Sequence, residues 1–148
     1  MNFNNYKDFP RFGRILGLDW GLRRCGVAVS DETRDFVFVR PQINVKSQSE
    51  LVDAILSMAG EEGVVGIIIG LPLYSDGTDS DTTKMVRDFA NNLAGRTNLP
   101  ILFVEENLSS FAAQQKMGKT SMAKIKENLD SLSAQVILEN AIDLLRRN

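Results

Sequence analysis

The sequence has 148 residues, of which 43% are hydrophobic and 24% charged, values that are ordinary for one globular domain. No run of about 18 apolar residues is present and the first dozen residues lack the apolar stretch of a signal peptide, so we expect a cytoplasmic protein without a membrane partner. Histidine is absent, which excludes Ser-His and Cys-His nucleophilic pairs, and the net charge of −2 provides no overall attraction to nucleic acid.

Two short apolar runs near the start of the chain are separated by a tight turn. Residues 15–18 and 25–29 predict two neighbouring strands. Asp19 ends the first strand, and Gly21 has no side chain, so the backbone of the turn can approach a phosphate closely. This arrangement suits a charged ligand, but an Asp that only stabilises a turn would give the same pattern. The role of Asp19 therefore depends on which other acids join it.

The elements after the first two strands indicate that the sheet continues with one more antiparallel strand and then with parallel strands. A third strand is predicted over residues 36–40. Ser47 and Glu50 have the spacing of a capping box, which begins a helix that ends near Gly60. Residues 64–72 are apolar on both faces, as expected of a central strand that helices cover on both sides.

A further strand over residues 101–104 runs directly into two adjacent acids, Glu105 and Glu106. Because side chains alternate along a strand, only one of these acids is expected to face the same side as Asp19. Further helices are predicted over residues 78–93, 110–117 and 129–146. Asp130 falls in the first turn of the last helix, where the helix dipole favours an acid in any case.

The order of elements predicts an α/β fold with one five-stranded mixed sheet, whose first three strands are antiparallel and which helices flank. We expect a flexible leader over residues 1–13 and a single domain over residues 14–148. In this topology Asp19, the Glu105/Glu106 pair and Asp130 could meet. Carboxylates of this kind are typical ligands of Mg²⁺ or Mn²⁺, which can support phosphodiester hydrolysis without histidine.

Four segments, in order and at compatible spacing, resemble the pattern of one known family. They are Asp19-x-Gly21-x-x-Arg24-x-Gly26, Gly70-Leu-Pro72 with Asp76-Gly77-Thr78, Val104-Glu-Glu106-Asn-Leu-Ser109-Ser110, and Leu129-Asp130-Ser-Leu-Ser-Ala134. The chain resembles the YqgF family, also called RuvX, from about Arg14 to Leu145. This resemblance implies an RNase H-like fold and a metal-dependent nuclease in which Asp19, Glu106 and Asp130 form the catalytic, Mg²⁺- or Mn²⁺-binding triad.

Two positions depart from the family pattern, which reads Asp-Glu-Arg before Leu. That pattern assigns the family's Glu to Glu106, and this chain has Glu105 in place of the Asp and Asn107 in place of the Arg. Loss of the Arg removes a bidentate phosphate donor, so we expect substrate affinity or specificity to differ from that of family members that carry the Arg. Substrate contacts are instead expected from Arg23, Arg24, Lys119, Lys124, Ser109 and Ser110.

The leading hypothesis is a cytoplasmic nuclease that matures the 5′ end of precursor 16S rRNA in ribosome biogenesis, with ribosomal particles as further partners. A second hypothesis is a Holliday-junction-resolvase-like endonuclease acting on branched DNA, which would require a homodimer with two active sites, whereas the rRNA hypothesis allows a monomer. A third hypothesis, of another class, is a non-catalytic nucleotide- or RNA-binding regulatory module, since actin-like ATPases share a distant Asp-x-Gly hairpin.

Overall fold

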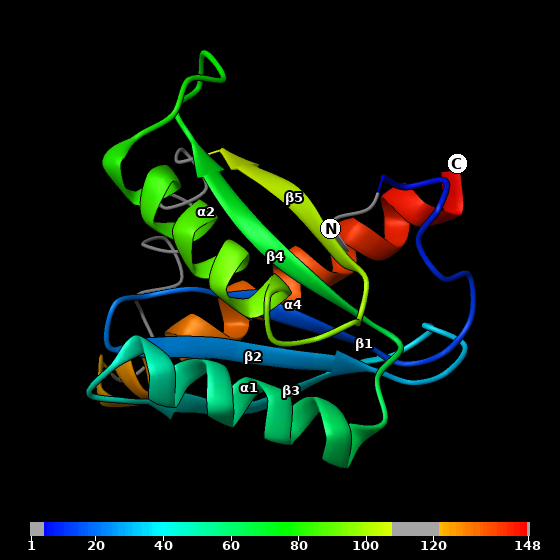
Figure 1. Ribbon diagram of the computed structural model, residues 1–148, viewed down its shortest axis with the longest axis horizontal. Helices are drawn as coiled ribbons and strands as arrows, with labels where there is room; N and C mark the ends of the chain where they lie inside the picture. Colours follow the sequence, from blue (N-terminus) through cyan, green and yellow to red (C-terminus); the bar gives the residue numbers. More distant parts are fainter. Residues whose placement is uncertain (1–4, 108–121, 148) are drawn as a thin grey trace.

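The computed structural model describes residues 5–107 and 122–147, with side chains for all of them except Asn107 and residues 122–130. Its five strands form one mixed sheet in the order β3-β2-β1-β4-β5 (Figure 1). The strands are β1 (Ile15–Asp19), β2 (Arg24–Ser30), β3 (Val37–Asn44), β4 (Gly66–Leu73) and β5 (Ile101–Asn107). The helices of the described part are α1 (Gln48–Glu62), α2 (Asp81–Ala94) and α4 (Met122–Arg147).

The strand pairing confirms the predicted mixed sheet. β2 pairs antiparallel with both β1 and β3, whereas β4 pairs parallel with both β1 and β5. β3 runs through Pro41 to Asn44, beyond the predicted end at Arg40. Pro41 lies where the register between β2 and β3 shifts, so the ladder tolerates its missing N–H there.

Helices cover both faces of the sheet, as the apolar character of β4 predicts. α1 and α2 pack on one face, and α4 crosses the other face (Figure 1). α4 approaches closely at Gly17 of β1, where an added Cβ would lie 2.9 Å from the Cβ of Leu138 and 3.2 Å from the carbonyl oxygen of Ala134. Among the helices of the described part, none is long and apolar enough to cross a membrane.

The capping residues explain where α1 and α2 begin, and two of the helices begin at other residues than predicted. Ser47 caps α1 by accepting a hydrogen bond from the backbone N–H of Glu50 at 3.2 Å. α2 begins three residues later than predicted, because Ser80 and Thr83 cap each other's backbone N–H groups. α4 begins at Met122, seven residues before the predicted start, and the predicted helix over residues 110–117 lies outside the described residues.

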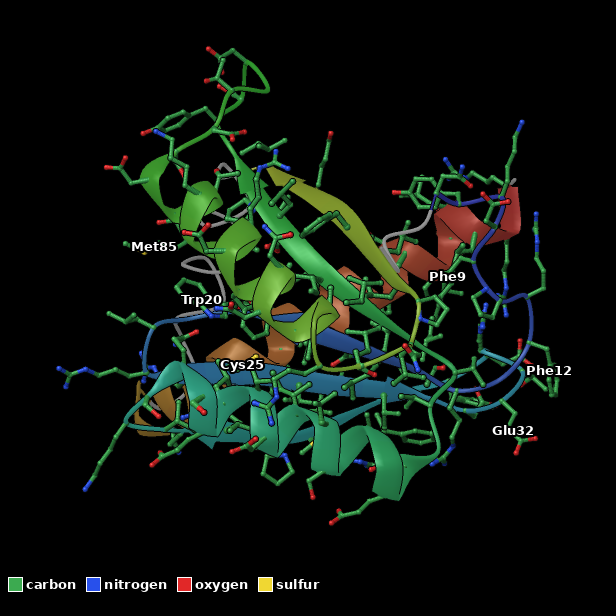
Figure 2. The ribbon with its side chains drawn as sticks, in the orientation of Figure 1. Phe9, Phe12, Trp20, Cys25, Glu32 and Met85 are labelled. Carbon is green, nitrogen blue, oxygen red and sulfur yellow. The ribbon has the colours of Figure 1, made fainter. Side chains whose placement is uncertain are left out.

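The segment before β1 contributes a side chain to the core. Phe9 is only 1% exposed and packs with α4 residues on the face of the sheet that α4 covers (Figure 2). Its ring occupies the space above Gly66 where a side chain would otherwise stand. Arg11 donates a hydrogen bond to the carbonyl oxygen of Leu145 at 3.3 Å. We predicted a flexible leader over residues 1–13, and Phe9 corrects that boundary, because side chains before Arg14 belong to the core.

Candidate active site

The carboxyl ends of β1, β4 and β5 lie at one edge of the sheet, because these three strands are parallel. Asp19 is the last residue of β1, is partly buried, and pairs with Gly26 of β2. Side chains alternate along a strand, so Asp19 shares the face of Gly17, which contacts α4. The first predicted acid therefore stands at the sheet edge on the α4 side.

Glu106 of β5 reaches over the neighbouring strand β4. It lies two residues beyond Val104, whose side chain is buried on the α4 face, and its backbone is in register with Pro72. A Cβ added at Gly70 would lie 2.9 Å from Oε2 of Glu106 and 2.5 Å from Cδ1 of Ile137 in α4. The missing side chain at position 70 thus makes the space that the carboxyl group and Ile137 share.

Register brings Asp19 and Gly70 next to one another. Leu18 pairs with Ile69 in the parallel ladder, and Asp19 and Gly70 are the following residues of the two strands. The carboxyl group of Glu106 therefore lies over the strand that borders Asp19. Glu105, by contrast, is exposed. Strand alternation thus places Glu106, and not Glu105, on the face of Asp19.

Burial raises the pKa of Glu106 from its ordinary value near 4.5 to about 7. The cause is desolvation, which favours the neutral form of the carboxyl group. A cation bound beside it would instead favour the carboxylate. A partly buried acid with a raised pKa at the carboxyl ends of parallel strands is typical of functional sites.

The raised pKa of Glu106 predicts how stability depends on pH. The folded protein holds this proton up to about pH 7 and the unfolded chain releases it near 4.5, so the contribution to stability is full below pH 4.5 and is lost as pH rises through 7. The variant Glu106→Gln does not lose stability in this way, because its side chain does not ionise. We expect it to exceed the wild type in unfolding free energy by about 2 kcal/mol at pH 8, after allowing for partial exposure of the side chain.

Urea unfolding in EDTA at several pH values measures this difference. The advantage of Glu106→Gln should be largest above pH 7 and should shrink as the pH falls from 7 to 4.5. A difference that stays constant over this range would show that Glu106 is ionised in the folded protein at all these pH values.

The backbone of α4 carries Asp130 toward the same edge. Position 130 shares a helix face with Ala134 and Ile137, one and two turns later. Ala134 lies against Gly17 of β1, and Ile137 lies at Gly70 of β4. The side chain of Asp130 lies outside the description, and among the described side chains no group of three Asp, Glu, Cys or His residues could hold a metal. Asp19 and Glu106 thus lie on one face of the sheet. The complete triad with Asp130 stays a prediction.

The turn between β1 and β2 and the first residue of β2 carry the two predicted substrate-binding arginines. Arg23 and Arg24 are exposed. The turn is fixed by α1, because Nε1 of Trp20 donates to Oε1 of Gln48 at 2.9 Å and Nε2 of Gln48 donates to the carbonyl oxygen of Leu22 at 2.9 Å. This link between the turn and α1 was not apparent from the sequence. The remaining predicted substrate-binding residues lie outside the described side chains: Ser109, Ser110, Lys119 and Lys124.

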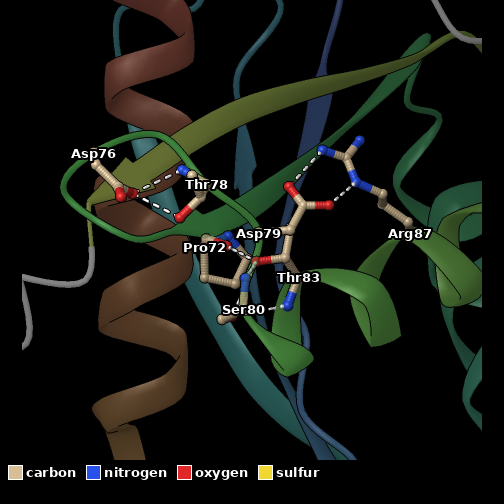
Figure 3. A network of polar contacts seen from close by, with 7 residues as sticks. All are labelled: Pro72, Asp76, Thr78, Asp79, Ser80, Thr83 and Arg87. Atoms are coloured by element: carbon tan, nitrogen blue, oxygen red, sulfur yellow. Dashed lines mark hydrogen bonds and ion pairs between the residues drawn. The ribbon is translucent and has the colours of Figure 1, made fainter.

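The loop after β4 is held by its own polar contacts (Figure 3). Asp76 accepts hydrogen bonds from the backbone N–H and the hydroxyl of Thr78, at 3.0 and 2.6 Å. These bonds lower the pKa of Asp76, as expected of a turn residue. The hydroxyl of Thr83 donates to the carbonyl oxygen of Pro72, which ties α2 to the end of β4. The carboxylate of Asp76 is thus occupied within the loop.

A protein-family model described as "RuvX: Holliday junction resolvase" matches residues 13–144. The chain belongs to the RuvX family. A RuvX relative from Maridesulfovibrio salexigens, named "Putative pre-16S rRNA nuclease", is 39% identical over 128 residues, which cover 85% of this chain and 95% of the relative. A protein of the same name from Sphingopyxis alaskensis is 39% identical over 140 residues, covering 93% of this chain and 91% of the relative.

Solved structures support the RNase H-like fold of this RuvX protein. Thermus thermophilus RuvC in complex with a Holliday junction substrate superposes with a TM-score of 0.59 at 11% identity, covering 91% of this chain and 96% of RuvC. The yeast mitochondrial Holliday junction resolvase Ydc2 gives a TM-score of 0.50 at 13% identity, covering 96% of this chain and 82% of Ydc2. At these identities the likeness establishes the fold alone.

Proposed function

We propose that this RuvX protein is a metal-dependent nuclease that hydrolyses phosphodiester bonds, and that it matures the 5′ end of precursor 16S rRNA in the cytoplasm. The observation that carries this proposal is the carboxyl group of Glu106, which is partly buried on the face of Asp19 at the carboxyl ends of three parallel strands. The names of the bacterial relatives support the rRNA substrate.

The described donor groups fit a hard divalent cation. Asp19 and Glu106 offer carboxylate oxygens from the two strands that flank β4, and the missing side chain at Gly70 gives the carboxyl group of Glu106 its place over β4 beside Ile137. Asp130 would supply the third carboxylate. When bound in such a site, Mg²⁺ or Mn²⁺ lowers the pKa of water and neutralises charge on the phosphate. Binding would replace the proton of Glu106, so affinity for the metal should rise with pH toward neutrality.

The residues of the chain then have separate roles in the proposed reaction. Asp19 and Glu106 would hold the cation from the ends of β1 and β5, which hydrogen bonding fixes within the sheet. Arg23 is exposed on the turn that follows Asp19 and Arg24 is exposed at the start of β2, where their guanidinium groups can bind phosphates of the substrate.

The likeness to resolvase structures supports a second candidate, cleavage of branched DNA. The decisive experiment incubates the protein with RNA spanning the 5′ end of 16S rRNA and its precursor sequence, and in parallel with a four-way DNA junction. Each reaction is run with Mg²⁺, with Mn²⁺ and with EDTA. We expect metal-dependent cleavage of the RNA. Cleavage of the junction alone would establish the second candidate, and binding without any cleavage would favour a non-catalytic RNA-binding module.

The variant Gly70→Ala tests the position of Glu106. The added methyl group would displace the carboxyl group of Glu106 and the tip of Ile137, both of which can move at modest cost. We expect Mn²⁺ to bind roughly ten times more weakly, as measured by calorimetry, with an unfolding free energy reduced by about 1–2 kcal/mol. The control is Gly60→Ala in α1, where an added Cβ meets nothing within 4 Å. Equal Mn²⁺ affinities in the two variants would contradict the placement of Glu106 in a metal site.

A further inference from the structure

Ser131 of α4 joins the helix to the sheet through two hydrogen bonds. Its side chain is 1% exposed. Oγ accepts a hydrogen bond from the backbone N–H of Val27 in β2 at 3.4 Å and donates one to the backbone carbonyl of Arg40 in β3 at 2.8 Å. A single hydroxyl group thus bridges two strands from the helix that covers them.

The bridge stands where the ladder between β2 and β3 is irregular. Val27 is in register with Arg40 and Cys25 with Ile43, so β3 has one extra residue between these two pairs. Gly26 lies opposite this bulge. On its other side, Gly26 pairs with Asp19 of β1. Ser131 therefore contacts the part of the sheet that borders the first acid of the candidate site.

Ser131 also directly follows Asp130 in α4. Consecutive residues of a helix are rotated by about 100°, so fixing Ser131 over β2 and β3 fixes the rotation of this turn. Position 130 then lies on the side of Ala134 and Ile137, whose contacts are Gly17 of β1 and Gly70 of β4. A rotation of the turn would move position 130 away from the strand ends that carry Asp19 and Glu106.

We propose that Ser131 is a positioning residue, which bridges the bulge between β2 and β3 and thereby holds Asp130 at the metal site beside Asp19. This inference rests on the proposed function, because it assigns Asp130 to that site. Groups that orient metal ligands typically affect metal affinity by 10–100-fold when they are removed. Removal of the Ser131 hydroxyl should therefore weaken metal binding more than its effect on stability would suggest.

A matched control lies at the other end of β2. Ser30 is 0% exposed, and its hydroxyl accepts a hydrogen bond from the backbone N–H of Ile15 and donates one to the carbonyl of Asp31, both at 3.0 Å. Ser30→Ala removes a comparable buried bridge that is distant in the strand from Asp19. Both alanine variants should lower the thermal unfolding temperature by a similar amount, because each loses one buried hydroxyl with two hydrogen bonds.

The experiment measures Mn²⁺ binding to the full chain by calorimetry, without substrate, and thermal unfolding of the same samples. We expect Ser131→Ala to weaken Mn²⁺ binding about tenfold, Ser131→Cys to weaken it less, and Ser30→Ala to leave it within twofold of the wild type. In a chain that already carries Asp130→Asn, Ser131→Ala should have no further effect on affinity, because its partner has been removed.

The possible results separate the positioning role of Ser131 from the proposed nuclease function. Wild-type affinity in both Ser131 variants would overturn the positioning role and leave the nuclease proposal intact. The same follows if Ser131→Ala has its full effect in the Asp130→Asn chain, or if Ser30→Ala weakens binding equally. Absence of Mn²⁺ binding to the wild type would overturn the proposed function and this inference with it. If Ser131→Ala does not fold, Ser131→Cys alone decides the comparison.

Discussion

Replacing Asp19 with Asn is expected to lower the rate of metal-dependent cleavage by about a thousandfold, because one charged ligand of the proposed cation becomes a neutral amide. The change keeps the size of the side chain at the end of β1, so the fold should remain. Glu106→Gln and Asp130→Asn should have effects of similar size. The measurement is the single-turnover rate on the preferred substrate at saturating Mg²⁺, with circular dichroism to verify folding.

Asp76→Asn is the matched control for Asp19→Asn. Asp76 also follows a strand of the sheet, but its carboxylate is bound to Thr78 within the loop, and Asn supports the same turn. We expect its cleavage rate to stay within about threefold of the wild type, far less than any loss of a metal ligand. Unchanged cleavage by folded Asp19→Asn would remove Asp19 from the mechanism.

The second large effect is expected on stability, from Phe9→Ala. The Phe9 ring is buried against Gly66 and the α4 face of the sheet, and its removal leaves a cavity that the rigid β-strands cannot close (Figure 2). We expect the free energy of unfolding to fall by about 3–4 kcal/mol. Thermal unfolding should shift downward by on the order of 10 °C. Urea titrations followed by the fluorescence of Trp20 measure the change.

Phe12→Ala provides the comparison within the same segment. Phe12 is 65% exposed, so its removal should change the free energy of unfolding by less than about 0.5 kcal/mol. The contrast between two phenylalanines only three positions apart tests the packing of the N-terminal segment directly. Equal losses for the two variants would mean that the Phe9 ring is not in the core.

Periodicity in the sequence was sufficient to predict the sheet. The apolar character of β4 on both faces indicated a central strand, and the structure places β4 between β1 and β5 with helices on both sides. Phe9 could not be predicted in the same way. It stands alone in a polar segment without a repeating pattern, and its burial depends on Gly66, which is far away in the sequence.

The sequence identified the residues of the candidate site but not the contacts that hold them in place. Strand alternation allowed only one of Glu105 and Glu106 to face Asp19, and the family pattern selected Glu106. The raised pKa of Glu106 depends on packing over Gly70, which no local pattern reveals. The bridge made by Ser131 was likewise invisible, because it spans the register shift between two strands that are distant from α4 in the sequence.

The most direct test of the central claim is a crystal structure of the protein grown with Mn²⁺, in which anomalous scattering locates the metal. The account predicts one or two Mn²⁺ ions with oxygens of Asp19, Glu106 and Asp130 at about 2.1 Å. It would be contradicted by carboxyl groups too far apart to share a cation, with no anomalous signal between them.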